Sequence, residues 1–177
     1  MTIELSGSQP TIGPPDVSFD NSGSGERELT AWPMRGAQTG FLAFDRDGDG
    51  RVTSGRELFG RVTPQSGSHC RWTGVKALAE LDGIAFGGNR DGRLDARDKA
   101  FASLLIWFDS NHDGVADPSE VLQVRDLGIQ SIDLAYTKMN LALNMAGDAT
   151  AVTGLLHAKL QTGAMVNVYS VQLTRSK

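Results

Sequence analysis

Apolar residues recur at a helical period in the first two thirds of the chain. "TGVKALAELD" places Val75, Leu78 and Leu81 on one face behind Thr73, a residue type that caps helices, and so predicts a short helix. "DPSEVLQVRDLG" at residues 117–128 predicts another, because it combines a capping aspartate, a first-turn proline, a capping-box glutamate and a glycine stop. "DARDKAFASLLIWF" fits a helix that starts at Asp95, but a strand is the alternative for its run "LLIWF", since a short apolar run cannot be assigned by period alone.

Beyond Gly128 the period changes from helical to alternating. Apolar and polar residues alternate at 132–136, 141–145 and 169–173, and "QTGA" separates two alternating runs as a hairpin turn does. Residues 129–177 therefore predict a small antiparallel sheet.

The composition fits one soluble, folded domain. Of the 177 residues 40% are hydrophobic, and the net charge of −4 gives no basis for nucleic-acid binding. No apolar run approaches the roughly 20 residues of a membrane-spanning helix, and Met1–Pro10 lacks the pattern of a signal peptide. Cys70 is the single cysteine, so no intrachain disulfide can form.

Four clusters of Asp, Asn, Ser and Gly repeat along the chain at unequal spacing. They read "DNSGSGERE", "DRDGDGRVT", "GNRDGRLDARD" and "DSNHDGVADPSE", starting at Asp20, Asp45, Gly88 and Asp109. Like charges this close repel one another, so the clusters indicate either a bound cation or solvated acidic turns. Calcium takes six to eight oxygen ligands, which a twelve-residue loop supplies from positions 1, 3, 5, 7, 9 and 12, with glycine at position 6.

The cluster at 109–120 fits this calcium loop at every position. The side chains of Asp109, Asn111, Asp113 and Glu120 and the carbonyl of Val115 are predicted ligands. Asp117 stands at position 9 and Gly114 at position 6.

The cluster at 45–57 fits almost as well. Its predicted ligands are the side chains of Asp45, Asp47 and Asp49 and the carbonyl of Arg51. The twelfth residue is Arg56, which cannot coordinate a cation, so we expect a loop longer by one residue that Glu57 closes.

The other two clusters are less regular. In the third, the predicted ligands are Asn89, Asp91, the Arg93 carbonyl and Asp98, whereas position 1 falls on a glycine; Asp82 reaches back to that position if "GIAFG" bulges outward. The first cluster replaces two carboxylates by Ser22 and Ser24 and has alanine at position 12, which favours a degenerate half-site. Because such loops pair through position 8, we expect Val52 beside the first cluster and Leu94 beside Ala116.

The order of "GFLAFDRDGDGRVTSGRELFG", "GVKALAELD", "DGRLDARDKAFASLLIWFDSNHDGVADPSEV" and "LGIQSIDLAYT" resembles the EF-hand-like calcium-binding segments of bacterial repeat-in-toxin and haemolysin-type proteins. The likeness covers residues 17–137. It implies a thirteen-position loop closed by the glutamate of "ELFG", which is Glu57, and export from a bacterial cell. The chain departs from the family at "GIAFGG", in its serine-substituted first loop, and in lacking glycine-rich nonapeptide repeats.

The expected fold class is thus α+β, with paired EF-hand-like calcium loops and short helices followed by a small antiparallel sheet. We expect residues 1–16 to form a flexible arm because they are rich in Ser, Gly and Pro. Residues 17–128 are the expected calcium-binding region and residues 129–177 the β region, packed together as one domain.

Other chemistry has weaker support in the sequence. A zinc site or a Cys/His nucleophile would have to combine His69, Cys70, His112 and His157, which show no clustered ligand spacing. Trp32, Trp72 and Trp107 are expected to be core or loop anchors rather than a sugar-binding platform.

The sequence therefore predicts a non-enzymatic calcium-binding protein, secreted or at the cell surface, in which Ca²⁺ orders an exported module. The alternative is a calcium sensor that exposes a surface for an unidentified protein partner. Sensors offer a Met-rich groove between long helices, whereas the five methionines here lie mostly in the strand region. An enzyme that carries these loops as scaffolding is a third alternative.

Overall fold

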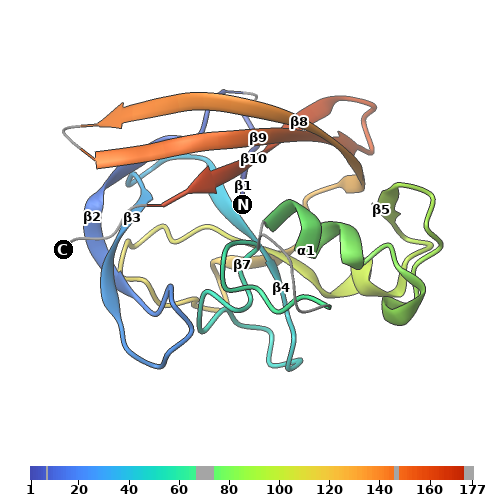
Figure 1. Cartoon of the computed structure of the whole chain (residues 1–177), viewed down its shortest axis with the longest axis horizontal. Coiled ribbons are helices and arrows are strands. Elements are labelled where there is room, and N and C mark those ends of the chain that lie inside the picture. The colour runs from blue at the N-terminus through green and yellow to red at the C-terminus, as the bar shows by residue number, and fades with distance from the viewer. Residues whose placement is uncertain (7, 67–73, 146–147, 174–177) are drawn as a thin grey trace.

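A computed structural model describes residues 1–6, 8–66, 74–145 and 148–173 of the chain (Figure 1). It contains an eight-stranded antiparallel sheet of strand order β5-β8-β9-β10-β1-β4-β6-β7 and a separate hairpin, β2–β3. The sheet strands are β1 (Thr2–Glu4), β4 (Thr39–Phe44), β5 (Arg93–Asp95), β6 (Leu104–Trp107), β7 (Val121–Gln123), β8 (Ile129–Met145), β9 (Asp148–Leu160) and β10 (Met165–Gln172). The hairpin strands are β2 (Ile12–Phe19) and β3 (Glu28–Pro33), and the helical elements are α1 (Gly74–Glu80) and the 3₁₀ turns η1 (Ile84–Phe86) and η2 (Lys99–Ser103).

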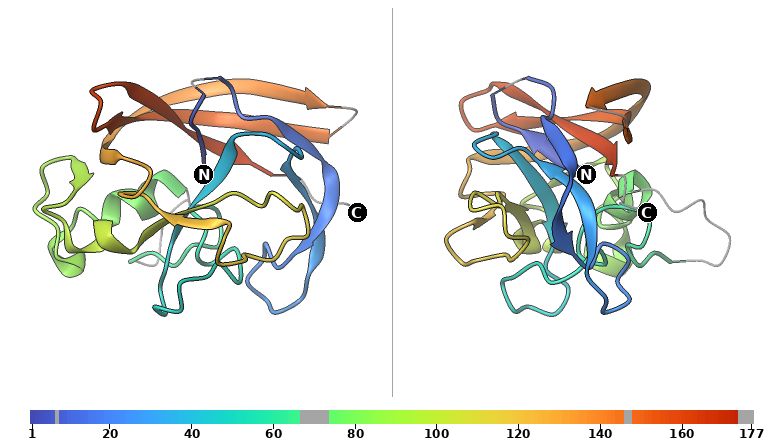
Figure 2. Two further views of the ribbon diagram at one scale, coloured as in Figure 1. Left: turned by 180° about the vertical axis from the view of Figure 1, so that it is seen from behind. Right: turned by 90° about the vertical axis from the view of Figure 1, so that its left-hand side faces the viewer.

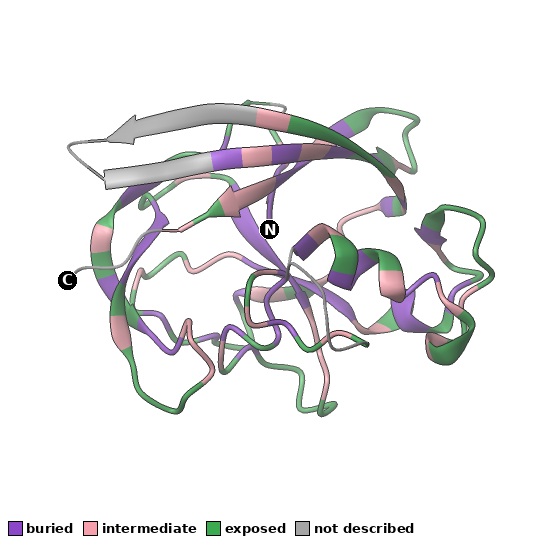
Figure 3. Ribbon diagram, viewed as in Figure 1, coloured by how far each residue is buried: buried purple, intermediate pink, exposed green. Residues whose placement is uncertain are grey.

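The sheet is curled, so its long β8–β9 hairpin lies over α1 (Figures 1 and 2). The β2–β3 hairpin covers one end of the molecule, next to the loop between β6 and β7. Exposed residues are concentrated in the loops, whereas the inner strands are largely buried (Figure 3).

The inner strands β4 and β6 are buried on both faces. Leu42, Leu104 and Ile106 belong to a hydrophobic cluster with α1 and the curled part of the sheet. Their neighbours along the strands, Phe41 and Trp107 among them, belong to a second cluster with the β2–β3 hairpin. Because side chains of a strand alternate between its faces, a strand between two cores reads as a continuous apolar run, as "GFLAF" and "LLIW" do.

The predicted fold class is wrong, because the described residues form mainly an antiparallel sheet and not paired helices around calcium loops, although the 82–98 loop does lie between the helical elements α1 and η2. Within the described residues α1 is the one α-helix, and it confirms the helix expected in "TGVKALAELD". Its expected cap, Thr73, lies outside the described residues. The helix predicted at 117–128 is instead a turn followed by β7, which pairs with β6. In that turn the N–H of Glu120 donates to the carbonyl of Asp117, while the Glu120 side chain accepts from Ser110 and Asn111 and so caps no helix.

The strand interpretation of "LLIWF" is confirmed, since residues 104–107 form β6 behind the short turn η2. The expected hairpin turn at 161–164 connects β9 to β10. The β region does not stand apart, however, because β10 continues through β1 into β4.

The N-terminal segment is not a separate arm in this fold. Thr2–Glu4 form β1 between β10 and β4, and the Ile3 side chain is fully buried. Residues 12–19 form β2. The Ser, Gly and Pro residues that suggested an arm lie mainly in the connection between the two strands and within β2, whose pairing with β3 is interrupted around Pro15.

Candidate metal centre

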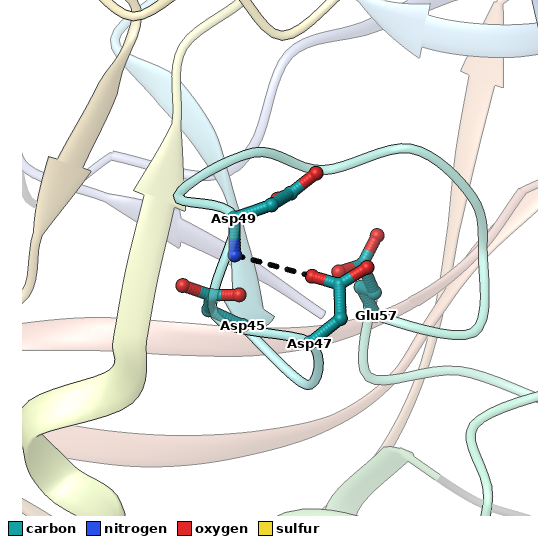
Figure 4. A group of neighbouring side chains, drawn as sticks. All are labelled: Asp45, Asp47, Asp49 and Glu57. Atoms are coloured by element: carbon teal, nitrogen blue, oxygen red, sulfur yellow. Dashed lines mark hydrogen bonds between the residues drawn. The ribbon is translucent and has the colours of Figure 1, made fainter.

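The loop at 45–57 brings four carboxylates together. Ligand oxygens of Asp45, Asp47, Asp49 and Glu57 all lie within 4.8 Å of one another (Figure 4). Among the residues that the structure describes, no other three or more His, Cys, Asp and Glu ligand atoms gather this closely. The side chains that the sequence analysis assigned to positions 1, 3, 5 and 13 of this loop are therefore the ones that meet, and they can hold a metal ion.

Local hydrogen bonds fold this loop around its aspartates. The two carboxylate oxygens of Asp45 accept from the N–H groups of Gly48 and Gly50, at 2.8 and 3.1 Å. Both glycines have positive φ, 78° and 73°, a conformation that residues with a Cβ rarely adopt. Asp47 and Asp49 each accept from the N–H two residues ahead of them.

Glu57 closes the loop from a buried position. Its Oε2 accepts from the N–H and the hydroxyl of Thr53, at 2.8 and 2.9 Å, while its Oε1 is buried and has no hydrogen-bond partner. The backbone is fixed as well, because the Glu57 carbonyl accepts from the N–H of Phe44, and Leu58 bridges to Ala43. A buried carboxylate oxygen without a donor is energetically costly, and a cation bound beside it would remove this cost.

The loop at 109–120 connects β6 to β7, and its end carboxylates are held by donors within the protein. Asp109 Oδ2 accepts from the N–H of Gly114 at 2.9 Å and from the indole N–H of Trp32 at 2.7 Å. Glu120 Oε1 accepts from the N–H groups of Ser110 and Asn111 and from the Ser110 hydroxyl.

These donors shape the electrostatics at Glu120. Burial, the largest single influence, acts to raise the pKa of this carboxyl, but the bonds from Ser110 and Asn111, with a long one from the Trp107 indole, outweigh it and lower the pKa. The acidic ligand atoms of this loop do not gather within 4.8 Å as those of the 45–57 loop do. Asp113 accepts from the Val115 N–H, and Asp117 is exposed.

The loop at 82–98 contains two buried carboxylates. Asp82 Oδ2 accepts from the N–H of Gly92 at 2.9 Å, and its buried Oδ1 has no partner. Asp98 accepts from the N–H groups of Asn89 and Asp95. Asp91 lies at the exposed side, where it pairs with Arg97. Asp82, Asp91 and Asp98 do not gather within 4.8 Å of one another as a group.

The first cluster, between β2 and β3, satisfies its own aspartate. Asp20 accepts from the N–H groups of Gly25 and Ser24 and from the Ser22 hydroxyl. The cluster lies beside the 45–57 loop as expected, but among the described residues Val52 takes part in no strand pairing, and the hydrogen bonds between the two run through Gly55 and Arg56. The Gly55 N–H donates to the Asp20 carbonyl, and a Cβ at Gly55 would lie 2.2 Å from the carbonyl oxygen of Asn21.

The expected pairing of Leu94 with Ala116 does not occur. Leu94 pairs with Ile132 of β8 instead. Ala116 and Val52, the position 8 residues of their loops, both pack into the hydrophobic cluster that contains Trp32.

The residues considered for other chemistry lie apart. His112 pairs with Asp16 and His157 with Asn167, whereas His69, Cys70 and Trp72 lie outside the described residues. Trp32 and Trp107 are fully buried, so their expected role as core anchors is confirmed. The bond of Trp32 to Asp109 carried no signal in the sequence, because the two residues are 77 positions apart.

Comparison with known proteins places the chain in a family. The sequence profile of the SPM domain matches residues 5–173. The chain belongs to the SPM domain family. It is also 39% identical over 122 residues to the iron-regulated protein FrpA of Neisseria meningitidis serogroup C. That match covers 69% of this chain and 10% of FrpA, so the chain corresponds to a small part of this relative. None of the helices among the described residues is long and apolar enough to cross a membrane.

Proposed function

We propose that this SPM domain is a non-enzymatic calcium-binding module. The observation that carries the proposal is the group of four carboxylates at 45–57, one of which, Glu57, keeps a buried oxygen without a donor. Four acidic groups this close repel one another unless a cation lies among them. Hard oxygen ligands at alternate positions of a glycine-containing loop suit calcium, which tolerates irregular geometry better than magnesium does.

The loop at 109–120 is the second proposed calcium site and the loop at 82–98 the third. The 109–120 loop has the full ligand spacing of a calcium loop, and the 82–98 loop has this spacing except at position 1, where Asp82 reaches back. In both loops the first aspartate accepts from the glycine N–H at the loop's turn. Binding at 109–120 requires Glu120 to give up part of its present hydrogen bonding, since three donors already use its Oε1.

We further propose that calcium orders an exported bacterial module of repeat-in-toxin type. The resemblance of residues 17–137 to such segments supports this, as does the match to FrpA. In the low calcium of a cell the aspartates repel and loosen the loops, and external calcium closes them. The one α-helix of the described residues is seven residues long, which supports this structural role over that of a sensor, since a sensor opens a groove between long helices.

Calorimetry of the chain with calcium tests the proposal. We expect at least two bound ions, loss of one on Asp47→Asn, and weaker binding of magnesium. No heat of binding, or magnesium bound equally well, contradicts it. A hydrophobic dye added during the titration separates the two roles, because a sensor gains dye binding with calcium and a structural module does not.

A further inference from the structure

The β2–β3 hairpin holds the 109–120 loop although it lies far from it in sequence. The two are neighbours at the same end of the molecule (Figures 1 and 2). One contact is made by the indole N–H of Trp32, which donates to Asp109 Oδ2 at 2.7 Å. With the Gly114 N–H on the same atom, the two lone pairs of Oδ2 are used. Asp109 Oδ1 accepts one bond, from Asp113, so this oxygen keeps a lone pair for a cation.

Two arginines of the hairpin region fix the backbone of the same loop. The guanidinium of Arg27 donates to the carbonyls of Asp113 and Gly114, at 3.3 and 3.1 Å, and also to the carbonyl of Ser18 in β2. Arg35, just after β3, donates to the carbonyl of Asn111 at 2.7 Å. The carbonyls of Asp113 and Gly114 directly precede the predicted ligand carbonyl of Val115, so Arg27 constrains the turn that carries it, and Arg35 holds the loop further upstream.

Gly114 shows how closely the loop lies against β2. A Cβ at this glycine would be 2.4 Å from the Ser18 carbonyl oxygen and 2.8 Å from Val17. Gly50, at the same position of the 45–57 loop, has nearly the same φ, 73° against 70°, yet nothing lies within 4 Å of its added Cβ. Contact with β2 is thus a property of the 109–120 loop and not of its turn geometry.

A shared core joins the hairpin to both ends of the loop. The Trp32 and Trp107 rings are 5.3 Å apart, and Phe19 and Phe41 pack against both. Trp32 bonds to the first carboxylate of the loop, and Trp107 makes a longer bond, 3.5 Å, to the last one, Glu120.

We infer that the β2–β3 hairpin is part of the 109–120 calcium site, with Trp32 and Arg27 as positioning residues that orient Asp109 and the carbonyl turn. The inference rests on the proposed calcium binding of this loop. Linkage then requires that an ion bound at 109–120 strengthens the docking of the hairpin on the loop. The gain in free energy equals that by which the docked hairpin strengthens ion binding.

The test is a calcium titration of the full chain in which the backbone amides of Gly114 and Gly50 are followed by NMR. Trp32→Phe keeps the aromatic ring and removes the donor. We expect this change to weaken calcium binding at Gly114 by about tenfold, the effect of one charge-assisted hydrogen bond, while the Gly50 titration is unchanged. Arg27→Gln, an exposed substitution, should weaken the Gly114 response in the same direction. Arg125→Gln serves as the matched control, because Arg125 is exposed in the turn after β7 and pairs with Asp126.

The outcomes separate this inference from the proposed function. Binding at Gly114 that is unaffected by both variants overturns the inference alone. Equal weakening at Gly114 and Gly50 also overturns it, because general destabilisation would then explain the result. A wild-type chain whose Gly114 amide does not respond to calcium, while Gly50 does, refutes both the inference and the site at this loop.

Discussion

The Asp82 carboxylate accepts a hydrogen bond from the N–H of Gly92, ten residues further on, at 2.9 Å. In the other loops, too, the first aspartate accepts from the N–H of the sixth-position glycine: Asp109 from Gly114, Asp45 from Gly50 and Asp20 from Gly25. By this hydrogen bond Asp82 corresponds to the first aspartate of the other loops. The extra residues between Asp82 and Gly92 include the turn η1, which has no buried residue.

Asp82→Ala should remove calcium binding from the third loop and leave the 45–57 loop intact. Asp82 is the proposed first ligand of this loop, and its Oδ1 is the one buried side-chain oxygen of the loop that has no donor. The Gly92 amide shift during a calcium titration reports the loop directly. Asp126→Ala, which removes an exposed carboxylate, is the control. If Gly92 responds to calcium equally in both variants, Asp82 is not a ligand.

Arg97→Gln should increase the calcium affinity of the third loop. The guanidinium lies 2.6 Å from both Asp91 Oδ2 and Asp95 Oδ2, so it already neutralises charge that an ion would use. Its bond to Asp95, and then its attraction to Asp91, raise the pKa of Arg97 above its ordinary value. Because the arginine is exposed, we expect a gain of only about two- to fivefold, smaller at high salt, in calorimetry at two salt concentrations. Unchanged or weaker binding would show that Arg97 does not compete with the ion.

Glu57→Gln and Arg56→Ala should differ sharply although the residues are adjacent. The first removes a buried charge from the group of four carboxylates, and we expect at least a tenfold loss of calcium affinity at this loop. The second removes an exposed side chain whose one long bond goes to the Gly23 carbonyl, and its effect should be small. Isothermal titration of both variants measures this. Similar losses would refute the thirteen-position loop.

The ligands of the 45–57 loop could be predicted from sequence because they are local. Alternating aspartates, a glycine with positive φ and a closing glutamate are fixed by positions within thirteen residues. The spacing did not predict how closely the ligand atoms of each loop approach one another. The 109–120 loop has the more complete pattern, yet its Glu120 accepts hydrogen bonds from the N–H groups of Ser110 and Asn111.

The flanking elements were mispredicted for a related reason. Capping residues at 117–120 favour a helix locally, but pairing of β7 with β6 determines the outcome, and that pairing depends on contacts outside the segment. The apolar run of β6 shows the same ambiguity, since both of its faces are buried. Likewise β1 is three residues long, and it forms a strand by pairing with β10 and β4, which are distant in the sequence.

Asp20→Asn should lower stability near neutral pH and have a diminishing effect in acid. Burial, the largest influence, acts to raise the pKa of Asp20, but the N–H groups of Gly25 and Ser24 and the Ser22 hydroxyl outweigh it and lower the pKa below the ordinary 3.8. A carboxylate with a lowered pKa stabilises the fold fully above its unfolded pKa, and this contribution is lost as the pH falls through the folded value. Thermal melts with chelator at pH 7, 4 and 3 should show the wild type and variant converging below pH 4. A constant difference would contradict the prediction.

Calcium removal should loosen the two halves of the sheet unequally. The 45–57 loop follows β4, and the 109–120 loop joins β6 to β7. These three strands are neighbours in the sheet. An ion that binds only the folded form stabilises it by about 2.7 kcal/mol per site at a hundredfold excess over Kd, so two sites supply roughly half the stability of an ordinary domain. Chelator should therefore lower the melting temperature substantially.

In hydrogen exchange the amides of β4, β6 and β7 should lose protection first, together with those of the β2–β3 hairpin that contacts the 109–120 loop. The β8–β9 hairpin pairs extensively with itself and with β10 and should lose protection later. Protection that chelator leaves unchanged would mean that these loops are acidic turns without a calcium-dependent role in the fold.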